Sequence, residues 1–170
     1  MKNTTRLLLA ALVCTGMVAC AKKVKETPPE PVDTTTQTQV DTTQTEGAYG
    51  PEDLDTDSCL RQRVVYFDYD RADIRAESQA ILACHGKYLR DRPSSAMTLE
   101  GHADERGTRE YNLGLGERRG NATSQALQAN GGSAGQINVV SYGEERPTCS
   151  ESSDDCWSKN RRVEIVYTAK

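Results

Sequence analysis

The stretch that decides the fold of this chain is Gly101-His102-Ala103-Asp104-Glu105-Arg106-Gly107-Thr108-Arg109-Glu110-Tyr111-Asn112. It follows an apolar run that contains Met97 and Leu99. Beyond it, apolar side chains recur at helical spacing, which predicts a helix from about Thr108 to Asn130. The apolar stripe expected on this helix consists of Tyr111, Leu115, Ala122, Ala126 and Ala129. The stretch is therefore a charged turn between a strand and a long helix.

Two arginines, Arg118 and Arg119, fall on this predicted apolar stripe. A charged side chain on a buried face is costly unless it is paired, and Asp104 in the turn is a natural partner for Arg119. A carboxylate and a guanidinium held at one turn suit a ligand that carries both an ammonium and a carboxylate. The spacing alone leaves a structural alternative open, in which Asp104 caps the helix or simply pairs with Arg119.

The remaining patterns predict four strands and two helices in the order β-α-β-α-β-β, an α+β fold class. Strands are expected at Val64–Phe67, Ala96–Gly101, Ile137–Tyr142 and Arg161–Tyr167, and the first helix is expected from Ile74 to Asp91. This order requires at least two crossover connections. The first strands should therefore be parallel, with one helical layer on the sheet.

The N-terminus has the pattern of an export signal. Lys2 and Arg6 precede the short apolar run 7–13, which falls well below the roughly 20 residues of a spanning helix. Met17-Val18-Ala19-Cys20 resembles a bacterial lipobox. We therefore expect residues 1–19 to be a lipoprotein signal peptide; the alternative is a plain secreted protein in which Cys20 is an ordinary thiol.

The resemblance to a lipobox implies that Cys20 carries the lipid. Two or three acyl chains, palmitate among them, would hold the protein stably on a membrane. Inner-membrane retention signals usually place Asp after the lipidated cysteine, and this chain has Ala21 there. The implied location is the outer membrane, with the folded domain in the periplasm.

Residues 20–57 are predicted to be a disordered tether, because they are rich in Thr, Gln, Pro and acidic residues and lack apolar periodicity. Residues 21–57 carry a net charge of −6, whereas residues 58–170, the predicted domain, sum to zero. The chain has no basic excess, which argues against nucleic acid as a partner.

Four cysteines fall in the predicted exported domain, and an even number in an oxidising compartment indicates two disulfides. Cys149 and Cys156 lie in one Ser/Asp-rich loop and are expected to pair, which leaves Cys59 with Cys84. The sequence does not fix this connectivity among the three possible pairings. A zinc site is disfavoured because no C-x-x-C spacing is present.

The chain lacks a recognisable catalytic or metal-binding constellation. It has two histidines: His85 is expected at the edge of the core, and His102 is expected to support the turn by hydrogen bonding. Asp104 and Glu105 are adjacent and point apart, unlike the facing carboxylates of a glycosidase. No Ser or Cys nucleophile has an evident base. We therefore expect no enzyme, no cofactor and no metal.

The chain resembles the OmpA-like peptidoglycan-binding domain family, and most closely its branch of peptidoglycan-associated lipoproteins. The matching segments occur in the family's order and spacing: 101–113 with 115–119, 65–70, 73–74, 140–147 and 159–164. The resemblance implies a mixed four-stranded sheet covered by helices over about residues 60–168. Gly114 and Gly120 depart from the family's usual Ala, at about 1 kcal/mol each in a helix interior.

The resemblance also implies a ligand, the meso-diaminopimelate residue of the peptidoglycan stem peptide. Asp104 would bind its free ammonium, and Arg119 would bind its free carboxylate. The other implied contacts are backbone amides near Tyr69 and Asp70, Leu115 on the ligand's methylenes, and Arg106 at the rim.

By the same resemblance, the protein would anchor the outer membrane non-covalently to peptidoglycan within the Tol–Pal system, in envelope integrity and cell division. TolB would bind a surface that overlaps the peptidoglycan site. The alternative is a protein-interaction module that serves only periplasmic partners.

Overall fold

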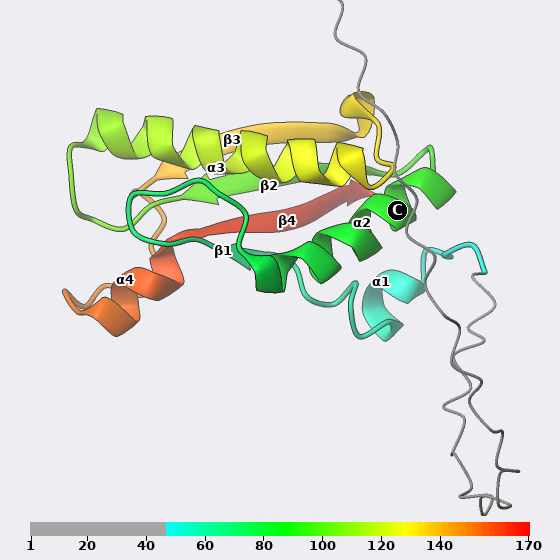
Figure 1. Ribbon diagram of the computed structural model, residues 1–170, viewed down its shortest axis with the longest axis horizontal. Helices are drawn as coiled ribbons and strands as arrows, with labels where there is room; N and C mark the ends of the chain where they lie inside the picture. Colours follow the sequence, from blue (N-terminus) through cyan, green and yellow to red (C-terminus); the bar gives the residue numbers. More distant parts are fainter. Residues whose placement is uncertain (1–46) are drawn as a thin grey trace, which may run out of the picture. The chain divides into compact units, whose positions relative to one another are not determined.

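The computed structural model describes residues 47–170, which form a mixed four-stranded sheet with two long helices on one face (Figure 1). In chain order the elements are α1 (Asp53–Thr56), β1 (Val64–Tyr66), α2 (Gln79–Asp91), β2 (Ala96–His102), α3 (Arg109–Ala129), β3 (Ile137–Gly143), α4 (Asp154–Asn160) and β4 (Arg162–Ala169). The predicted signal peptide, the lipidation site Cys20 and most of the predicted tether lie outside the described residues. Within residues 47–170, no helix has the length and apolar character needed to span a membrane.

The strand order in the sheet is β1-β4-β2-β3. β2 and β3 pair in parallel, with Met97 opposite Ile137, and β4 runs antiparallel to both β1 and β2. The first three strands therefore share one direction, as predicted, and the last strand lies between β1 and β2. This confirms the mixed α+β fold. It also brings the loops that follow β1 and β2 to the same end of the sheet.

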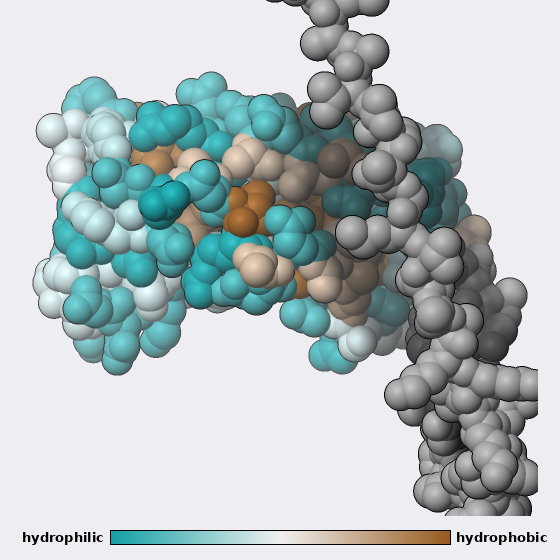
Figure 2. All heavy atoms as spheres, viewed as in Figure 1, coloured by the Kyte–Doolittle hydropathy of each residue, from teal (hydrophilic) through white to brown (hydrophobic). Residues whose placement is uncertain are grey.

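The core lies between the sheet and the two long helices. It contains alternate residues of the strands and one face of α2, joined by the end of α3: Val65, Phe67, Leu82, Leu89, Met97, Leu99, Leu127, Val163 and Ile165. The face that carries the helices is mostly hydrophilic, with hydrophobic residues visible between α3 and α2 (Figure 2). The first long helix begins later than predicted, since Ile74 lies in the loop before it and packs against this core.

The predicted apolar stripe of α3 is wrong in part. Leu115 is buried, but Tyr111 is 44% exposed and Ala129 is also exposed. The buried face is instead polar and small: Asn112, Leu115, Gly116, Arg119, Gly120, Thr123 and Leu127. Of the two arginines expected on the stripe, Arg119 is buried and Arg118 is exposed.

Close contact between α3 and the sheet explains this face. A Cβ atom on Gly116 would lie 2.3 Å from the Ser141 hydroxyl oxygen, and one on Gly120 would lie 2.5 Å from a methyl of Val139. Both distances are shorter than any normal contact, so Gly120 is required by packing. A Cβ on Gly114 would meet only the Arg118 guanidinium at 3.4 Å, and nothing in the structure explains that glycine.

The N-terminal boundary of the domain lies earlier than predicted. The tether was expected to extend to residue 57, but α1 is helical and Leu54 is fully buried against Leu60 and Tyr88. Asp57 accepts hydrogen bonds from the main-chain N–H groups of Cys59 (2.8 Å) and Leu60 (3.0 Å). A single leucine in a polar stretch gives no periodicity, which is why the pattern missed this segment.

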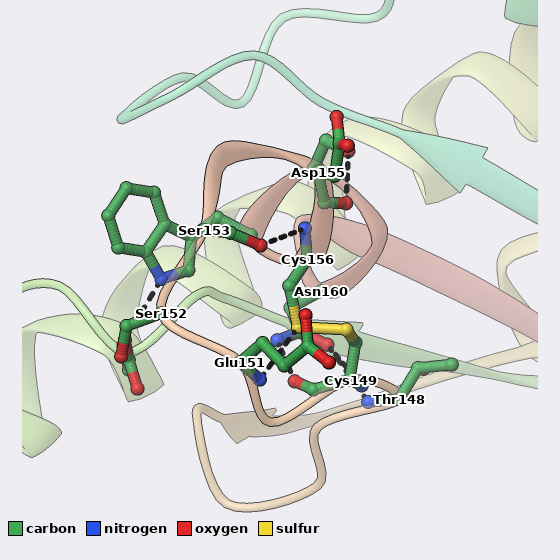
Figure 3. Close-up of a disulfide and its surroundings, with 11 residues drawn as sticks. Thr148, Cys149, Glu151, Ser152, Ser153, Asp155, Cys156 and Asn160 are labelled. Carbon is green, nitrogen blue, oxygen red and sulfur yellow. Dashed lines mark hydrogen bonds between the residues drawn. A yellow bond between two sulfur atoms is a disulfide. The ribbon is translucent and has the colours of Figure 1, made fainter.

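Both disulfides have the predicted pairing, Cys59–Cys84 and Cys149–Cys156. The second closes a loop that continues into α4, a helix that the sequence patterns did not predict. The Ser153 hydroxyl accepts the N–H of Cys156 at 3.3 Å and so caps α4 (Figure 3). The six residues before Cys156, 150–155, are all polar, and the short helix has no apolar stripe of its own, so the sequence pattern did not indicate it.

Candidate functional site

A pocket of about 120 Å³ lies where β1 and β2 end and α3 begins. Its walls come from the loop after β1, the charged turn after β2 and the first turns of α3: Tyr69, Asp70, Asp104, Arg106, Gly107, Tyr111, Asn112, Leu115 and Arg119. The structure therefore brings together all six residues that the sequence singled out for ligand binding. We refer to this site as the Asp104–Arg119 pocket.

The charged turn is held between a strand end and a helix cap. The main-chain N–H of Ala103 donates to the carbonyl of Gly143, which extends the pairing of β2 with β3 by one residue. The Thr108 hydroxyl caps α3 by accepting the N–H of Tyr111 at 3.2 Å. Asp104 therefore does not cap α3, which was one of the alternatives that the spacing left open.

Asp104 is nearly buried, with 4% of its surface exposed, and it is paired with two guanidiniums. One carboxylate oxygen accepts from the Arg106 main-chain N–H (3.1 Å) and from Arg106 Nε (3.0 Å). The other accepts from Arg106 Nη2 (2.7 Å) and from Arg161 Nη1 (3.3 Å). Burial acts to raise the pKa of this carboxyl, but the hydrogen bonds and charge of Arg106 outweigh it and hold the pKa below its usual value.

Arg119 is fully buried, and its partners are main-chain carbonyls. Its Nε donates to Arg71 O at 2.8 Å, Nη1 to His102 O at 2.8 Å, and Nη2 to Asp68 O at 3.0 Å. Among residues 47–170, no carboxylate forms an ion pair with it, so the structural alternative in which Arg119 simply pairs with Asp104 is wrong. Burial lowers the pKa of the guanidinium to about 10, against a weaker opposite effect of Asp104, and Arg119 remains charged at neutral pH.

In this arrangement, some of the N–H donors of Arg119 make no hydrogen bond to the described residues. A guanidinium has five N–H groups, and three are used by the carbonyls. Close approach of α3 to β2 puts Arg119 in this position: a Cβ on Gly101 would lie 2.0 Å from the carbonyl oxygen of Gly116. The other two N–H groups of this buried cation have no acceptor among residues 47–170, and its side chain lines the pocket.

The loop after β1 forms another wall and holds Arg119 through the carbonyls of Asp68 and Arg71. Asp70 has a left-handed backbone with φ of 56°, in a turn closed by the Arg71 N–H and the carbonyl of Asp68. Within the described part of the chain, the N–H groups of Tyr69 and Asp70 have no acceptor. The Tyr111 hydroxyl donates to the Asp70 carboxylate. Successive free N–H groups in such a turn are a common feature of anion sites.

Arg106 forms the rim of the pocket between two aromatic rings. Its guanidinium carbon lies 3.9 Å from the centre of the Tyr69 ring and 4.1 Å from that of the Trp157 ring. Such stacking stabilises a cation over an aromatic face. Trp157 comes from α4, which is distant in sequence, so neither Trp157 nor Arg161 was predicted to contribute to this site.

The sequence is similar to known proteins over most of its length. The sequence model of the OmpA family matches residues 66–161, more than half of the 170-residue chain. The chain belongs to the OmpA family. The peptidoglycan-associated lipoprotein of Pasteurella multocida is 36% identical over 98% of this chain and 100% of its own length. The protein of the same name from Brucella melitensis is 46% identical over 60% of this chain and 61% of its own length.

Solved structures of other proteins share the fold. The crystal structure of the peptidoglycan-associated lipoprotein from Burkholderia pseudomallei is 39% identical, with a TM-score of 0.66, over 68% of this chain and 98% of that one. The C-terminal domain of Helicobacter pylori MotB has a TM-score of 0.57 at 20% identity over 62% of this chain and 83% of that one. The second likeness supports the fold alone.

The two histidines of this OmpA-family domain differ from expectation. Both ring nitrogens of buried His102 lack a hydrogen-bond partner within residues 47–170, so its predicted hydrogen-bonding role is wrong. Its ring stacks on Tyr142, with centroids 5.6 Å apart. His85 is fully buried, with ring nitrogens 2.8 Å from the Tyr167 hydroxyl and 3.0 Å from the Gln62 carbonyl. Burial lowers the pKa of each to about 4.

Metal chemistry finds no support in the described part of the protein. Residues 47–170 contain no group of three or more His, Cys, Asp or Glu side chains placed to hold a metal ion. The Asp104–Arg119 pocket instead offers fixed charges of both signs and a single apolar side chain, Leu115. This set of groups suits recognition of a small zwitterion.

Proposed function

We propose that this OmpA-family protein binds peptidoglycan in the Asp104–Arg119 pocket, by gripping the meso-diaminopimelate residue of the stem peptide. The observation that carries the proposal is the buried guanidinium of Arg119, which lines the pocket and has no carboxylate partner among residues 47–170. An uncompensated buried charge is costly, and a ligand carboxylate would complete it. The names of relatives that are 36% and 46% identical support the same ligand class.

The carboxylate of the ligand would lie against Arg119 and the adjacent loop after β1. Two guanidinium N–H groups remain on Arg119, and the free N–H groups of Tyr69 and Asp70 belong to the loop whose carbonyls hold Arg119. Hydrogen bonds to a charged acceptor are about twice as strong as neutral ones. These donors would distinguish a free carboxylate from an amide or a hydrogen atom at the same position.

The ammonium of the ligand would lie beside Asp104, and the Asp70 carboxylate is a second anionic group in the wall. Asp104 keeps its negative charge because its pKa is lowered, even though Arg106 and Arg161 already pair with it. Leu115, which is 6% exposed, would pack on the methylenes between the two charged ends. We assign Asp104 to orientation of the ligand and Arg119 to most of the affinity.

Membrane anchoring completes the proposal. Residues 1–19 would be the signal peptide, Cys20 the lipid-bearing residue and the chain up to about residue 46 the tether. The lipid would hold the protein in the outer membrane while the pocket binds the cell wall, within the Tol–Pal system and with TolB as a partner. The role is one of binding, since the pocket offers charges for recognition and no nucleophile with an adjacent base.

Co-sedimentation with purified diaminopimelate-type sacculi tests the proposal. The protein is prepared with Cys20→Ser so that no lipid is attached, and compared with Asp104→Ala and Arg119→Ala variants. The matched control is Arg118→Ala, which removes the neighbouring, exposed arginine. We expect the parent and the control to pellet, and the two pocket variants, if folded by circular dichroism, to stay soluble. A parent protein that remains in the supernatant would refute cell-wall binding and favour a module for protein partners only.

A further inference from the structure

The loop closed by the Cys149–Cys156 disulfide contacts the rim of the Asp104–Arg119 pocket without lining it. Trp157 follows Cys156 directly, and its ring centre lies 4.1 Å from the guanidinium carbon of Arg106. The Tyr69 ring lies 3.9 Å from the same carbon. Arg106 is thus stacked on two aromatic rings, one from the loop after β1 and one from α4.

The orientation of Trp157 is fixed by hydrogen bonding. Its indole N–H donates to Glu105 Oε1 at 2.9 Å, and the Ser152 hydroxyl donates to the same oxygen at 2.6 Å. Glu105 lies between Asp104 and Arg106 in the chain. The disulfide loop therefore holds the charged turn at two points, once through the carboxylate of Glu105 and once through the guanidinium of Arg106.

The loop itself is held at both ends. The side chain of Asn160 accepts the N–H of Thr148 at 2.9 Å and donates to the carbonyl of Cys149 at 2.7 Å. Together with the disulfide and the Ser153 cap, these bonds join the two ends of the loop (Figure 3). α4 is too short to be stable alone, so its position depends on these links.

Fixing Arg106 fixes the carboxylate of Asp104. Arg106 contributes three of the four hydrogen bonds that Asp104 accepts from Arg106 and Arg161. An arginine at a solvent-exposed rim has many rotamers, and the side chain of Arg106 is 29% exposed. Stacking between two rings removes that freedom before a ligand arrives, which is the general advantage of preorganisation.

We propose that Trp157, on α4 next to the disulfide-closed loop, is a positioning residue for the pocket that acts through Arg106. The inference rests on the proposed function, because it concerns the affinity of the Asp104–Arg119 pocket for a diaminopimelate ligand. It gives the Ser/Asp-rich loop and its disulfide a role in ligand affinity, beyond their role in holding α4.

A double-mutant cycle tests whether Trp157 acts through Arg106. The dissociation constant for a diaminopimelate tripeptide is measured by calorimetry for the parent and for Trp157→Ala, Arg106→Ala and the double variant. We expect Trp157→Ala to weaken binding about fivefold in the parent and to have no further effect in the Arg106→Ala background. Trp157→Phe keeps an aromatic face and should recover part of the loss. An unchanged dissociation constant, or an equal loss in both backgrounds, would overturn the proposal.

Two further measurements separate this inference from its premises. The side-chain Nε–H resonance of Arg106 should shift in Trp157→Ala, because ring currents act on it in the free protein. A paired Cys149→Ser and Cys156→Ser variant should give the same shift and a similar loss of affinity; no shift in either variant would overturn the contact itself. If the parent binds no tripeptide but the Arg106 resonance shifts in both variants, the proposed function is refuted. The contact between Trp157 and Arg106 is then confirmed, but it has no role in binding this ligand.

Discussion

Asp104 and Arg119 lie in the walls of one pocket, yet the protein compensates their charges in opposite ways. Asp104 lies 2.7 Å from one guanidinium nitrogen and 3.3 Å from another. Arg119 has three carbonyl dipoles and, within the described residues, no ion-pair partner, although the charge of Asp104 acts on it from farther away. Asp104 therefore already has its charged partners within the fold, whereas Arg119 has none there and would form its ion pair with a ligand. We therefore predict that substitution of Asp104 mainly lowers the stability of the fold, whereas substitution of Arg119 mainly lowers the affinity for the ligand.

Arg119→Met should cause the largest loss of binding. The substitution removes the donors that we assign to the ligand carboxylate, and loss of a buried charged partner costs about 2–5 kcal/mol. We expect affinity for diaminopimelate sacculi to fall at least about 30-fold. The free energy of unfolding should fall less than in Asp104→Asn, because the substitution removes the buried charge of Arg119 together with its hydrogen bonds to the carbonyls. Urea unfolding and sedimentation of the same samples measure both quantities.

Asp104→Asn should destabilise the fold more than Arg119→Met. It leaves Arg106 and Arg161 without their shared carboxylate, and Arg161 is only 15% exposed. Breaking a buried pair costs about 3–5 kcal/mol, which partial exposure of Arg106 reduces to about 2 kcal/mol. Urea unfolding at neutral pH measures the difference. If Asp104→Asn is as stable as the parent while Arg119→Met unfolds, the assignment of roles is reversed.

Acid should weaken the fold before it weakens binding. The pKa of His85 and that of His102 are each lowered from 6.5 to about 4 in the folded protein, so the unfolded chain binds more protons between those values. Stability is then complete above pH 6.5 and is lost as the pH falls towards 4, by about 2 kcal/mol per histidine between pH 7 and pH 5.

The charges of the pocket do not change over that range, since the pKa of Asp104 is lowered and that of Arg119 is about 10. Affinity should therefore stay flat between pH 7 and pH 5. Urea unfolding at several pH values, with His102→Phe as the comparison, should show about half of the pH dependence removed. If the affinity for the ligand decreased together with the free energy of unfolding between pH 7 and pH 5, this prediction would be contradicted.

Gly114→Ala and Gly120→Ala should change stability alone, with opposite signs. A Cβ at residue 114 meets only the Arg118 guanidinium at 3.4 Å, so Ala should stabilise α3 by up to about 1 kcal/mol. A Cβ at residue 120 would lie 2.5 Å from Val139, so Ala there should destabilise the domain by about 1–3 kcal/mol. Thermal unfolding measures both. Neither substitution lies in the pocket, and stabilisation by Gly120→Ala would contradict the close packing of α3.

The fold was largely predictable because its strands and helices carry their own periodicity. Val163 and Ile165 alternate inward in β4 as expected, and Gly131 follows the end of α3. The exposure of Tyr111 was not predictable, because it depends on how closely α3 approaches Gly101 and Ser141 on other strands. Helical spacing assumes that large apolar residues face the sheet, and here the sheet is too near for them.

The sequence predicted which residues line the pocket, but it did not predict the hydrogen bonds and contacts that hold them. The six predicted residues came from a motif, and they do surround one cavity. The carbonyls that hold Arg119 come from the loop after β1 and the end of β2, and main-chain groups carry no sequence signal. Trp157 contacts Arg106 from α4, a short helix with no apolar pattern. Contacts of this kind depend on the tertiary structure.

The most direct test of the central claim compares two tripeptides in calorimetry against the parent protein. One ends in meso-diaminopimelate, and the other ends in lysine, which has the same ammonium but lacks the second carboxylate. Binding through Arg119 predicts that the lysine peptide binds at least about 30-fold more weakly, and that Arg119→Met abolishes this preference. Equal affinity for the two peptides would contradict the claim that the buried guanidinium of Arg119 binds the ligand's free carboxylate.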